Sequence, residues 1–147
     1  MDIIYCGYFA TYEAYLCALI HIGMEFDCYS MYSYFELCRK YSKQFGNLIF
    51  VGLDHELNRV YAMGCKEFTD VIINSQSSFR EIYDIGNDIK HIDTTKISTS
   101  LPHIIEKIGD NAHLYSAAKW LFYYWCRRMY PRARYFVKNE TGLFNSE

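Results

Sequence analysis

The residues best suited to chemistry lie directly after the first apolar run of the sequence. Residues 2–8 are mostly β-branched and aromatic, which predicts a buried strand, and Thr11, Tyr12 and Glu13 follow it. Open α/β sheets bind ligands beyond the carboxyl ends of their strands, where this segment is expected to lie. Tyr12 could stack on a flat ligand, and Glu13 could accept a proton or bind a cation. The same side chains could instead cover a core, so ligand binding here is one of two interpretations.

Two residues farther along the chain could join this site. His21 is expected late in the helix that begins near Thr11, at the negative end that stabilises an imidazolium, so it could transfer a proton. We favour a structural role in which His21 caps the helix by bonding a backbone carbonyl. Asp93 ends the short run at 90–93 and would reach the same loop only if its strand lies beside the first.

A third group of ionisable residues is better explained by a turn. Asp54, His55 and Glu56 are consecutive, and such a cluster superficially resembles a metal or acid–base site. Consecutive side chains in a turn point in different directions, and Asp54 and Asn58 are typical turn residues, so we interpret the cluster as part of a β-hairpin. The sequence also lacks the common nucleotide, zinc and hydrolase motifs. We therefore expect neither a metal nor a cofactor.

The cysteines and the hydropathy indicate where the protein works. Six cysteines at positions 6, 17, 28, 38, 65 and 126 form no CxxC pair, and no secretory leader precedes them. No stretch reaches the ~18 apolar residues of a membrane span. We expect reduced, mostly buried thiols in a soluble cytoplasmic protein without a transmembrane segment.

The C-terminal part of the sequence is basic and aromatic, whereas the rest is acidic. Six basic residues and no acidic one lie between Lys119 and Lys138, while residues 1–118 carry 9 Lys+Arg and 15 Asp+Glu. This segment could bind a partner protein or a second copy, bind nucleic acid or a membrane, or simply pack on the sheet. The acidic remainder would repel a polyanion, which makes nucleic acid unlikely as a partner. The candidate interface residues are Trp120, Tyr124, Arg127, Arg128, Arg132 and Arg134.

The elements that must position these residues follow from periodicity. Strand patterns occur at 2–8, 48–54, 59–65 and 90–93, and the middle two are separated by too few residues for anything but an antiparallel hairpin. Helical patterns cover 11–22, 34–45, 67–83, a stretch from Leu101, and 111–130, where Pro131 should kink or end the helix. We therefore predict a single α/β domain over 1–147. It contains a small mixed sheet of about four strands covered by helices, and the segment 111–138 forms a long, basic, aromatic C-terminal helix.

Several of these pieces together resemble a known family. The helix ends in Ile20-His21-Ile22-Gly23, and the hairpin contains Gly52-x-Asp54, Asn58-x-Val60-Tyr61 and Gly64. Over roughly residues 1–110 the chain resembles the domain-of-unknown-function 3189 family of Firmicutes. That family has a Gly-Gly-Thr-His-Ser-Ser loop after its first strand, which could cradle an anion. This chain has Phe9-Ala10-Thr11-Tyr12-Glu13-Ala14 there, so the resemblance implies the fold but an altered or lost site.

Two functions remain open from the sequence. The leading hypothesis is a non-catalytic or catalytically altered family member that works through protein–protein contact, including self-association, using the basic aromatic segment. The alternative is a small enzyme or anionic-ligand-binding protein with its site at the loop after the first strand, formed by Thr11, Tyr12 and Glu13 with help from His21 or Asp93.

Overall fold

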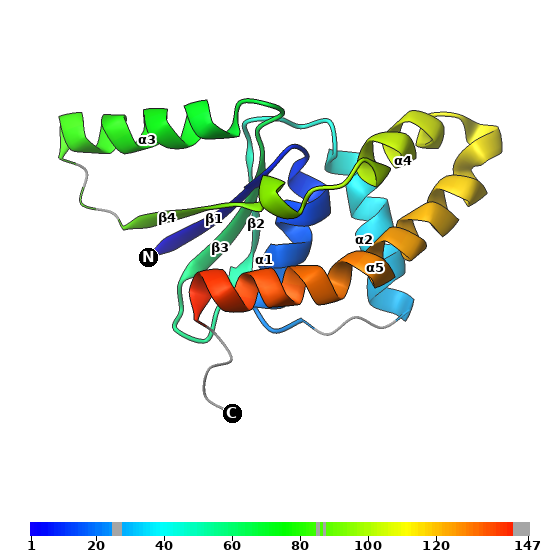
Figure 1. The fold of residues 1–147 in the computed structure, drawn as a ribbon, viewed down its shortest axis with the longest axis horizontal. Helices are drawn as coiled ribbons and strands as arrows, with labels where there is room; N and C mark the ends of the chain where they lie inside the picture. The colour runs from blue at the N-terminus through cyan, green and yellow to red at the C-terminus, as the bar shows by residue number, and fades with distance from the viewer. Residues whose placement is uncertain (25–27, 85, 87, 143–147) are drawn as a thin grey trace.

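A four-stranded mixed sheet forms the centre of the computed structural model, which describes residues 1–24, 28–84, 86 and 88–142 (Figure 1). Its strands are β1 (Asp2–Gly7), β2 (Leu48–Leu53), β3 (Arg59–Gly64) and β4 (Ile89–Asp93). Their order is β2-β3-β1-β4, with β1 parallel to both β3 and β4, and β2 antiparallel to β3. The predicted α/β class, mixed sheet and hairpin are confirmed, and the carboxyl ends of three parallel strands meet at one edge.

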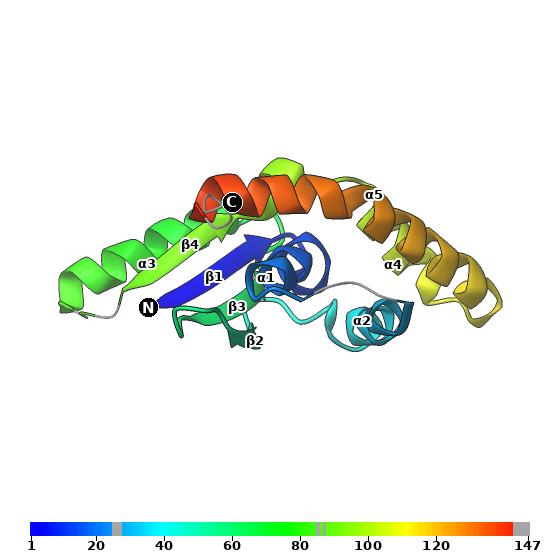
Figure 2. The same ribbon diagram turned by 90° about the horizontal axis from the view of Figure 1, so that it is seen from below.

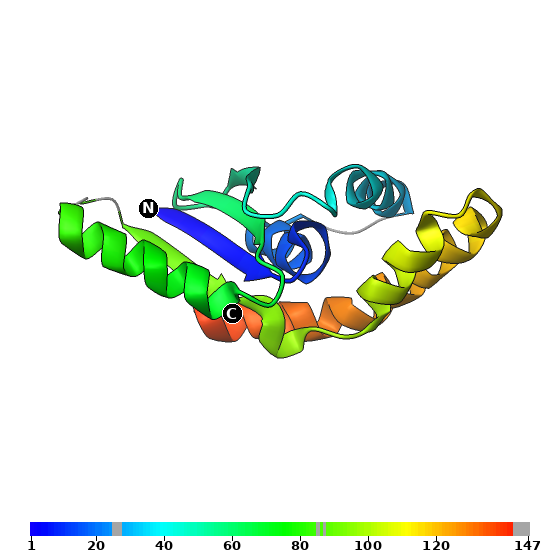
Figure 3. The same ribbon diagram turned by 90° about the horizontal axis from the view of Figure 1, so that it is seen from above.

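Helices cover the two faces of this sheet very unequally. They are α1 (Tyr15–His21), α2 (Cys28–Tyr41), α3 (Thr69–Tyr83), α4 (Leu101–Gly109) and α5 (Tyr115–Thr141). Helices α1, α2, α4 and α5 share one large core with Ile3 and Tyr5 of β1. The alternate residues Ile4 and Cys6 point to the other face and form a small cluster with α3. Figures 2 and 3 show the molecule from opposite sides, and α3 lies along β4 at the edge of the sheet.

The segment after β1 is more irregular than the periodicity predicted. A π-helical turn (Ala10–Ala14) precedes α1, and Tyr12 departs from helical geometry with φ −99° and ψ −111°. The Tyr12 ring packs against Phe122 and Trp125 of α5, with ring centroids 6.1 and 5.4 Å away. Thr11 does not cap this turn, because its hydroxyl bonds to no backbone N–H in the described structure. The predicted stop at Gly23 is confirmed by its φ of +79°.

The C-terminal helix is longer than predicted. Helix α5 continues through Pro131 to Thr141, so the proline does not end it, and Figure 2 shows that the helix bends along its length. Its buried side contributes Phe122, Trp125 and Met129 to the large core. The predicted long aromatic C-terminal helix is confirmed.

The expectations for the cysteines and for membrane-spanning segments can be compared with the part of the chain that the structure covers. Five of the six cysteines are free and buried, whereas Cys28 lies outside the described side chains. Among the described helices, none combines the length and the apolar character needed to cross a bilayer.

Candidate functional site

The loop after β1 is folded into the core. Thr11, Tyr12 and Glu13 have at most 2% of their surface exposed. The Tyr12 hydroxyl donates to Glu106 Oε1 at 2.6 Å, and the Thr11 carbonyl lies 3.0 Å from the Cys38 thiol. A ligand would therefore meet this segment only after a rearrangement, and direct binding by these three residues stays a prediction.

Close packing explains why this segment has no room for a ligand. A Cβ at Gly7 would lie 2.8 Å from the Thr94 hydroxyl, and a Cβ at Gly64 would lie 2.8 Å from the Ala10 nitrogen. The Thr94 hydroxyl donates to the Cys6 carbonyl at 2.9 Å, which joins the ends of β1 and β4. The two glycines thus permit the turn after β1 to lie directly against the neighbouring strand ends.

Glu13 is the most unusual ionisable group in this segment. Burial raises its pKa to about 7, although hydrogen bonds from its own backbone and from Thr99 act in the opposite direction. The Thr99 N–H donates to Glu13 Oε1 at 3.3 Å. A carboxyl group with such a pKa can hold a proton near neutral pH, which is the property of a general acid or base. Its burial excludes it from contact with bulk solvent.

A hollow of about 300 Å³ lies just beyond the same strand ends. It is lined by residues that follow β1, β3 and β4, together with the first turns of α3 and α4: Tyr8, Lys66, Glu67, Thr69, Asp70, Thr95, Ser98 and His103. Lys66 has a φ of +51°, an unfavourable conformation for a residue with a side chain. Strained residues of this kind cluster at functional sites. The hollow therefore lies where α/β sheets bind ligands, but it uses different residues from those predicted.

Asp93 does not point freely into this hollow. Its Oδ1 accepts hydrogen bonds from the N–H and the hydroxyl of Thr95, at 2.9 and 2.6 Å. The carboxylate thus caps the short 3-10 helix that follows β4. Asp93 is paired with Cys6 in the sheet register, so its strand does lie beside β1, and a role for Asp93 in a ligand site stays a prediction.

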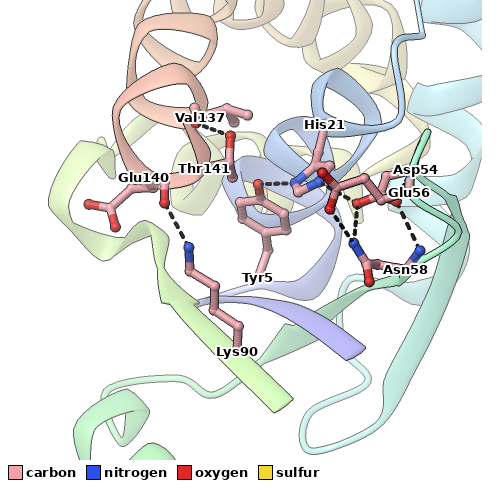
Figure 4. Close-up of polar contacts among 9 residues, drawn as sticks. All are labelled: Tyr5, His21, Asp54, Glu56, Asn58, Lys90, Val137, Glu140 and Thr141. Carbon is pink, nitrogen blue, oxygen red and sulfur yellow. Dashed lines mark hydrogen bonds and ion pairs between the residues drawn. The ribbon is translucent and has the colours of Figure 1, made fainter. Parts of the chain in front are cut away.

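His21 ends α1 and belongs to a buried polar network at the opposite end of this helix from the loop after β1 (Figure 4). The Tyr5 hydroxyl lies 2.7 Å from His21 Nδ1, and His21 Nε2 lies 3.1 Å from Asp54 Oδ2. Because an ionised carboxylate only accepts hydrogen bonds, we assign the proton to Nε2, which leaves Nδ1 to accept from Tyr5. Both ring nitrogens bond to side chains, so the predicted capping of a helix carbonyl is wrong.

The hairpin turn supplies the rest of this network. Asp54 Oδ1 accepts from the backbone N–H groups of Glu56 and Asn58, each at 2.9 Å, and Asn58 Nδ2 donates to Oδ2 at 2.9 Å. Burial alone would raise the pKa of Asp54, but these bonds and His21 lower it overall. Burial lowers the pKa of His21 despite Asp54. The network joins α1, β1 and the hairpin, which is consistent with the turn interpretation of Asp54.

The outer face of α5 is exposed along most of its length. We use this name for Trp120, Tyr124, Arg127, Arg128, Arg132 and Arg134, all of which are exposed. Trp120 and Tyr124 stack with ring centroids 6.0 Å apart and planes 13° apart, and Arg128 Nη1 donates to the Tyr124 hydroxyl at 2.8 Å. Trp120, Tyr124 and Arg128 follow one another at helical spacing and form an ordered aromatic and cationic surface.

A small cavity adjoins this face. Its volume is about 60 Å³, and Arg128 and Arg132 line it together with Thr99, Leu101, Trp125 and Met129. Trp125 Nε1 and the Thr99 hydroxyl are buried without a hydrogen-bond partner in the described structure. Two guanidinium groups and two unused polar groups around one cavity form an arrangement that suits a carboxylate.

Sequence reasoning missed the polar residues of the larger hollow. Lys66, Thr95 and Ser98 each lie within five residues after the end of a strand that the sequence had predicted correctly. Applying the strand-end rule to β3 and β4 as well as to β1 would have found them. His103 could not have been found in this way, because only the packing of α4 brings it to Tyr8, with ring centroids 4.4 Å apart.

Comparison with known proteins identifies the family. The family model described as "Protein of unknown function (DUF3189)" matches residues 2–140, so the match includes most of α5 as well as the sheet. No curated protein and no solved structure is detectably similar to this chain. The matched region thus contains the sheet, the hairpin and nearly all of the long C-terminal helix, and the chain belongs to the DUF3189 family.

Proposed function

We propose that this protein acts through protein–protein contact and that the outer face of α5 docks on an acidic surface of a partner protein. Trp, Tyr and Arg are the residues that contribute most to binding energy at protein interfaces. The stacked Trp120 and Tyr124 are already ordered, so little side-chain entropy would be lost when a partner binds.

The observation that carries this proposal is the cavity beside Arg128 and Arg132. A cavity of about 60 Å³ can admit a carboxylate but not a drug-sized ligand. Among the residues that the structure describes, no carboxylate forms a salt bridge with Arg127, Arg128 or Arg132. An Asp or Glu side chain of a partner would supply the missing charge.

Binding of a glutamate-rich peptide that contains one phenylalanine tests the proposal. We expect the affinity to fall at high salt, and Arg127→Glu with Arg128→Glu should weaken binding about tenfold or more. The matched control is Lys40→Glu with Lys107→Glu, which makes the same change of charge at exposed positions on α2 and α4. Equal binding by both double variants and the unaltered protein would refute the proposal.

A second candidate function rests on the hollow of about 300 Å³ at the carboxyl ends of β1, β3 and β4. Lys66 and His103 could bind an anionic group there, while Thr69, Thr95 and Ser98 supply hydroxyl groups. A native mass spectrum of the purified protein tests this function, because a retained small molecule would favour it. A spectrum of the bare chain would leave α5 as the better-supported site.

A further inference from the structure

Helix α3 carries large apolar side chains that none of the described residues covers. Four residues of α3 and the residue just before it have 54–74% of their surface exposed: Phe68, Val71, Phe79, Ile82 and Tyr83. Exposed apolar patches on monomeric proteins are usually small, and larger ones mark interaction sites. This surface lies on the opposite side of the sheet from α5, so it is separate from the docking face proposed above.

Apolar and small residues form a regular stripe along the helix, and Phe79 and Tyr83 lie beside it. Phe68, Val71, Ser75, Ser78 and Ile82 follow one another at alternating intervals of three and four residues. This is the spacing with which one helix packs against another. The stripe contains no charged residue, as is typical of the centre of an interface.

A different side of α3 holds it on its own sheet. Ile72 and Ile73 pack against the small cluster, Gln76 bonds to His91, and Arg80 Nη1 donates to the Ile89 carbonyl at 3.2 Å. At 100° per residue, the sheet-facing residues 69, 73, 76 and 80 centre about 150° around the helix from the stripe. The stripe is therefore unused by the contacts that hold α3 in place.

The sheet next to α3 is also incompletely covered. Phe50 pairs with Tyr61, and Tyr61 pairs with Ile4, so all three side chains lie on the α3 side of the sheet. Leu48 and Phe50 are 51% and 56% exposed. In Figure 3, α3 lies beside β4, and no helix lies in front of β1 and β3. One helix is thus missing from this layer.

We propose that a second copy of this chain supplies the missing helix and that two α3 helices pack antiparallel about a two-fold axis near Ser75. In that arrangement Phe68 meets Ile82 of the second copy, and Val71 meets Phe79 of the second copy. Large residues then pair at both ends, while Ser75 at the centre lets the backbones approach closely.

The exposed area is large enough for such a dimer. Five large apolar side chains at α3, each more than half exposed, offer on the order of 500 Å² per copy, and Leu48 and Phe50 of β2 add on the order of 200 Å² where the second copy reaches across the sheet. A standard stable interface buries roughly 800 Å² per partner. A self-complementary patch with two-fold symmetry is also the commonest form of homodimer contact.

Sedimentation of the whole protein at micromolar concentration tests the dimer. We expect a mass about twice the 17.4 kDa of one chain, both at high salt and in the Arg127→Glu, Arg128→Glu variant. Val71→Glu alone and Phe79→Lys alone should each shift the dimer constant at least tenfold toward monomer. The two together should restore dimer, because the new charges at positions 71 and 79 would face each other across the axis. Ser77→Glu, at an exposed position about 140° around α3 from the stripe, is the matched control and should remain dimeric.

The outcomes separate this dimer from the docking function of α5. A monomeric unaltered protein would overturn the dimer, as would an equal effect of Ser77→Glu or a double variant no more dimeric than the single ones. A dimer that dissociates at high salt and in the Arg127→Glu, Arg128→Glu variant would also overturn it, since that result would place self-association on α5. A monomer, or a dimer through α3, leaves the peptide-binding test unaffected, because neither uses the outer face of α5.

Discussion

Glu13 shows at the scale of one residue how a fold can hold a carboxyl group in its neutral form. Its pKa is raised to about 7 from an ordinary value of 4.5, chiefly by burial. The folded state therefore binds a proton between these two values while the unfolded state has already released it. The stabilisation from this group is complete below about pH 4.5 and is lost as the pH rises to about 7.

Glu13→Gln should remove this pH dependence. As the pH rises from 4.5 to 8, the difference in unfolding free energy between the two proteins should change by about 2–3 kcal/mol in favour of the variant, because glutamine has no charge to bury. Urea unfolding of both proteins at the two pH values measures the gain. His21 titrates in both proteins, so its contribution cancels in the difference, and a constant difference would show that Glu13 does not titrate as described.

The predicted ligand residues illustrate what a sequence reveals about individual side chains. The position of Thr11, Tyr12 and Glu13 after β1 was predicted correctly, but their burial depends on contacts with residues far along the chain. Tyr12 bonds to Glu106, 94 residues away, and Glu13 accepts from Thr99, 86 residues away. Helical periodicity carries no information about such partners.

At the scale of one element, the β2–β3 hairpin contains a residue in an unfavourable conformation. Leu57 has a φ of +64°, and its side chain is 76% exposed, so it has little packing to compensate for the strain. The left-handed region costs a residue with a Cβ about 1–2 kcal/mol. Hydrogen bonds from Leu57 N to Asp54 O and from Asp54 N to Asn58 O, at 3.0 and 3.1 Å, hold the turn in this form.

Leu57→Gly should therefore stabilise the protein by about 1 kcal/mol, which thermal or urea unfolding can measure. His55→Gly is the matched control, because His55 is exposed in the same turn and has no positive φ. The control should be neutral or slightly destabilising, since glycine adds only freedom to the unfolded chain. Similar effects of both substitutions would contradict the strain argument.

The helices and strands could be predicted where the local sequence pattern determines them. They were harder to predict where contacts with distant residues determine their conformation or length. The hairpin, β4 and α3 follow from alternation, turn residues and helical spacing, and all three are confirmed. The π-helical turn at Ala10–Ala14 was not predictable, because it depends on the packing of Tyr12 against Trp125 of α5. The extension of α5 past Pro131 depends in the same way on the buried contacts of Ala133 and Phe136.

At the scale of the whole molecule, the class of the fold could be predicted, but the strand order could not. The pairing of β1 with both β3 and β4 depends on contacts between distant segments, and no local pattern encodes it. The unequal covering of the two sheet faces has the same origin, so the exposed stripe of α3 became visible only in three dimensions.

The central position of β1 also affects how the chain reaches its structure. Asp2 bonds to Arg59, 57 residues later, and Cys6 bonds to Thr94, 88 residues later. During synthesis the first strand therefore emerges long before either neighbour, and closing these loops costs entropy before the sheet forms. We expect dilute refolding in milliseconds to seconds by stopped-flow fluorescence, slower than in helical proteins of similar length, and a microsecond phase carrying the full amplitude would contradict this. Until residue 94 has left the ribosome, β1 lacks one of the two strands that pair with it. Its apolar residues are then exposed and are a natural site for a chaperone to bind.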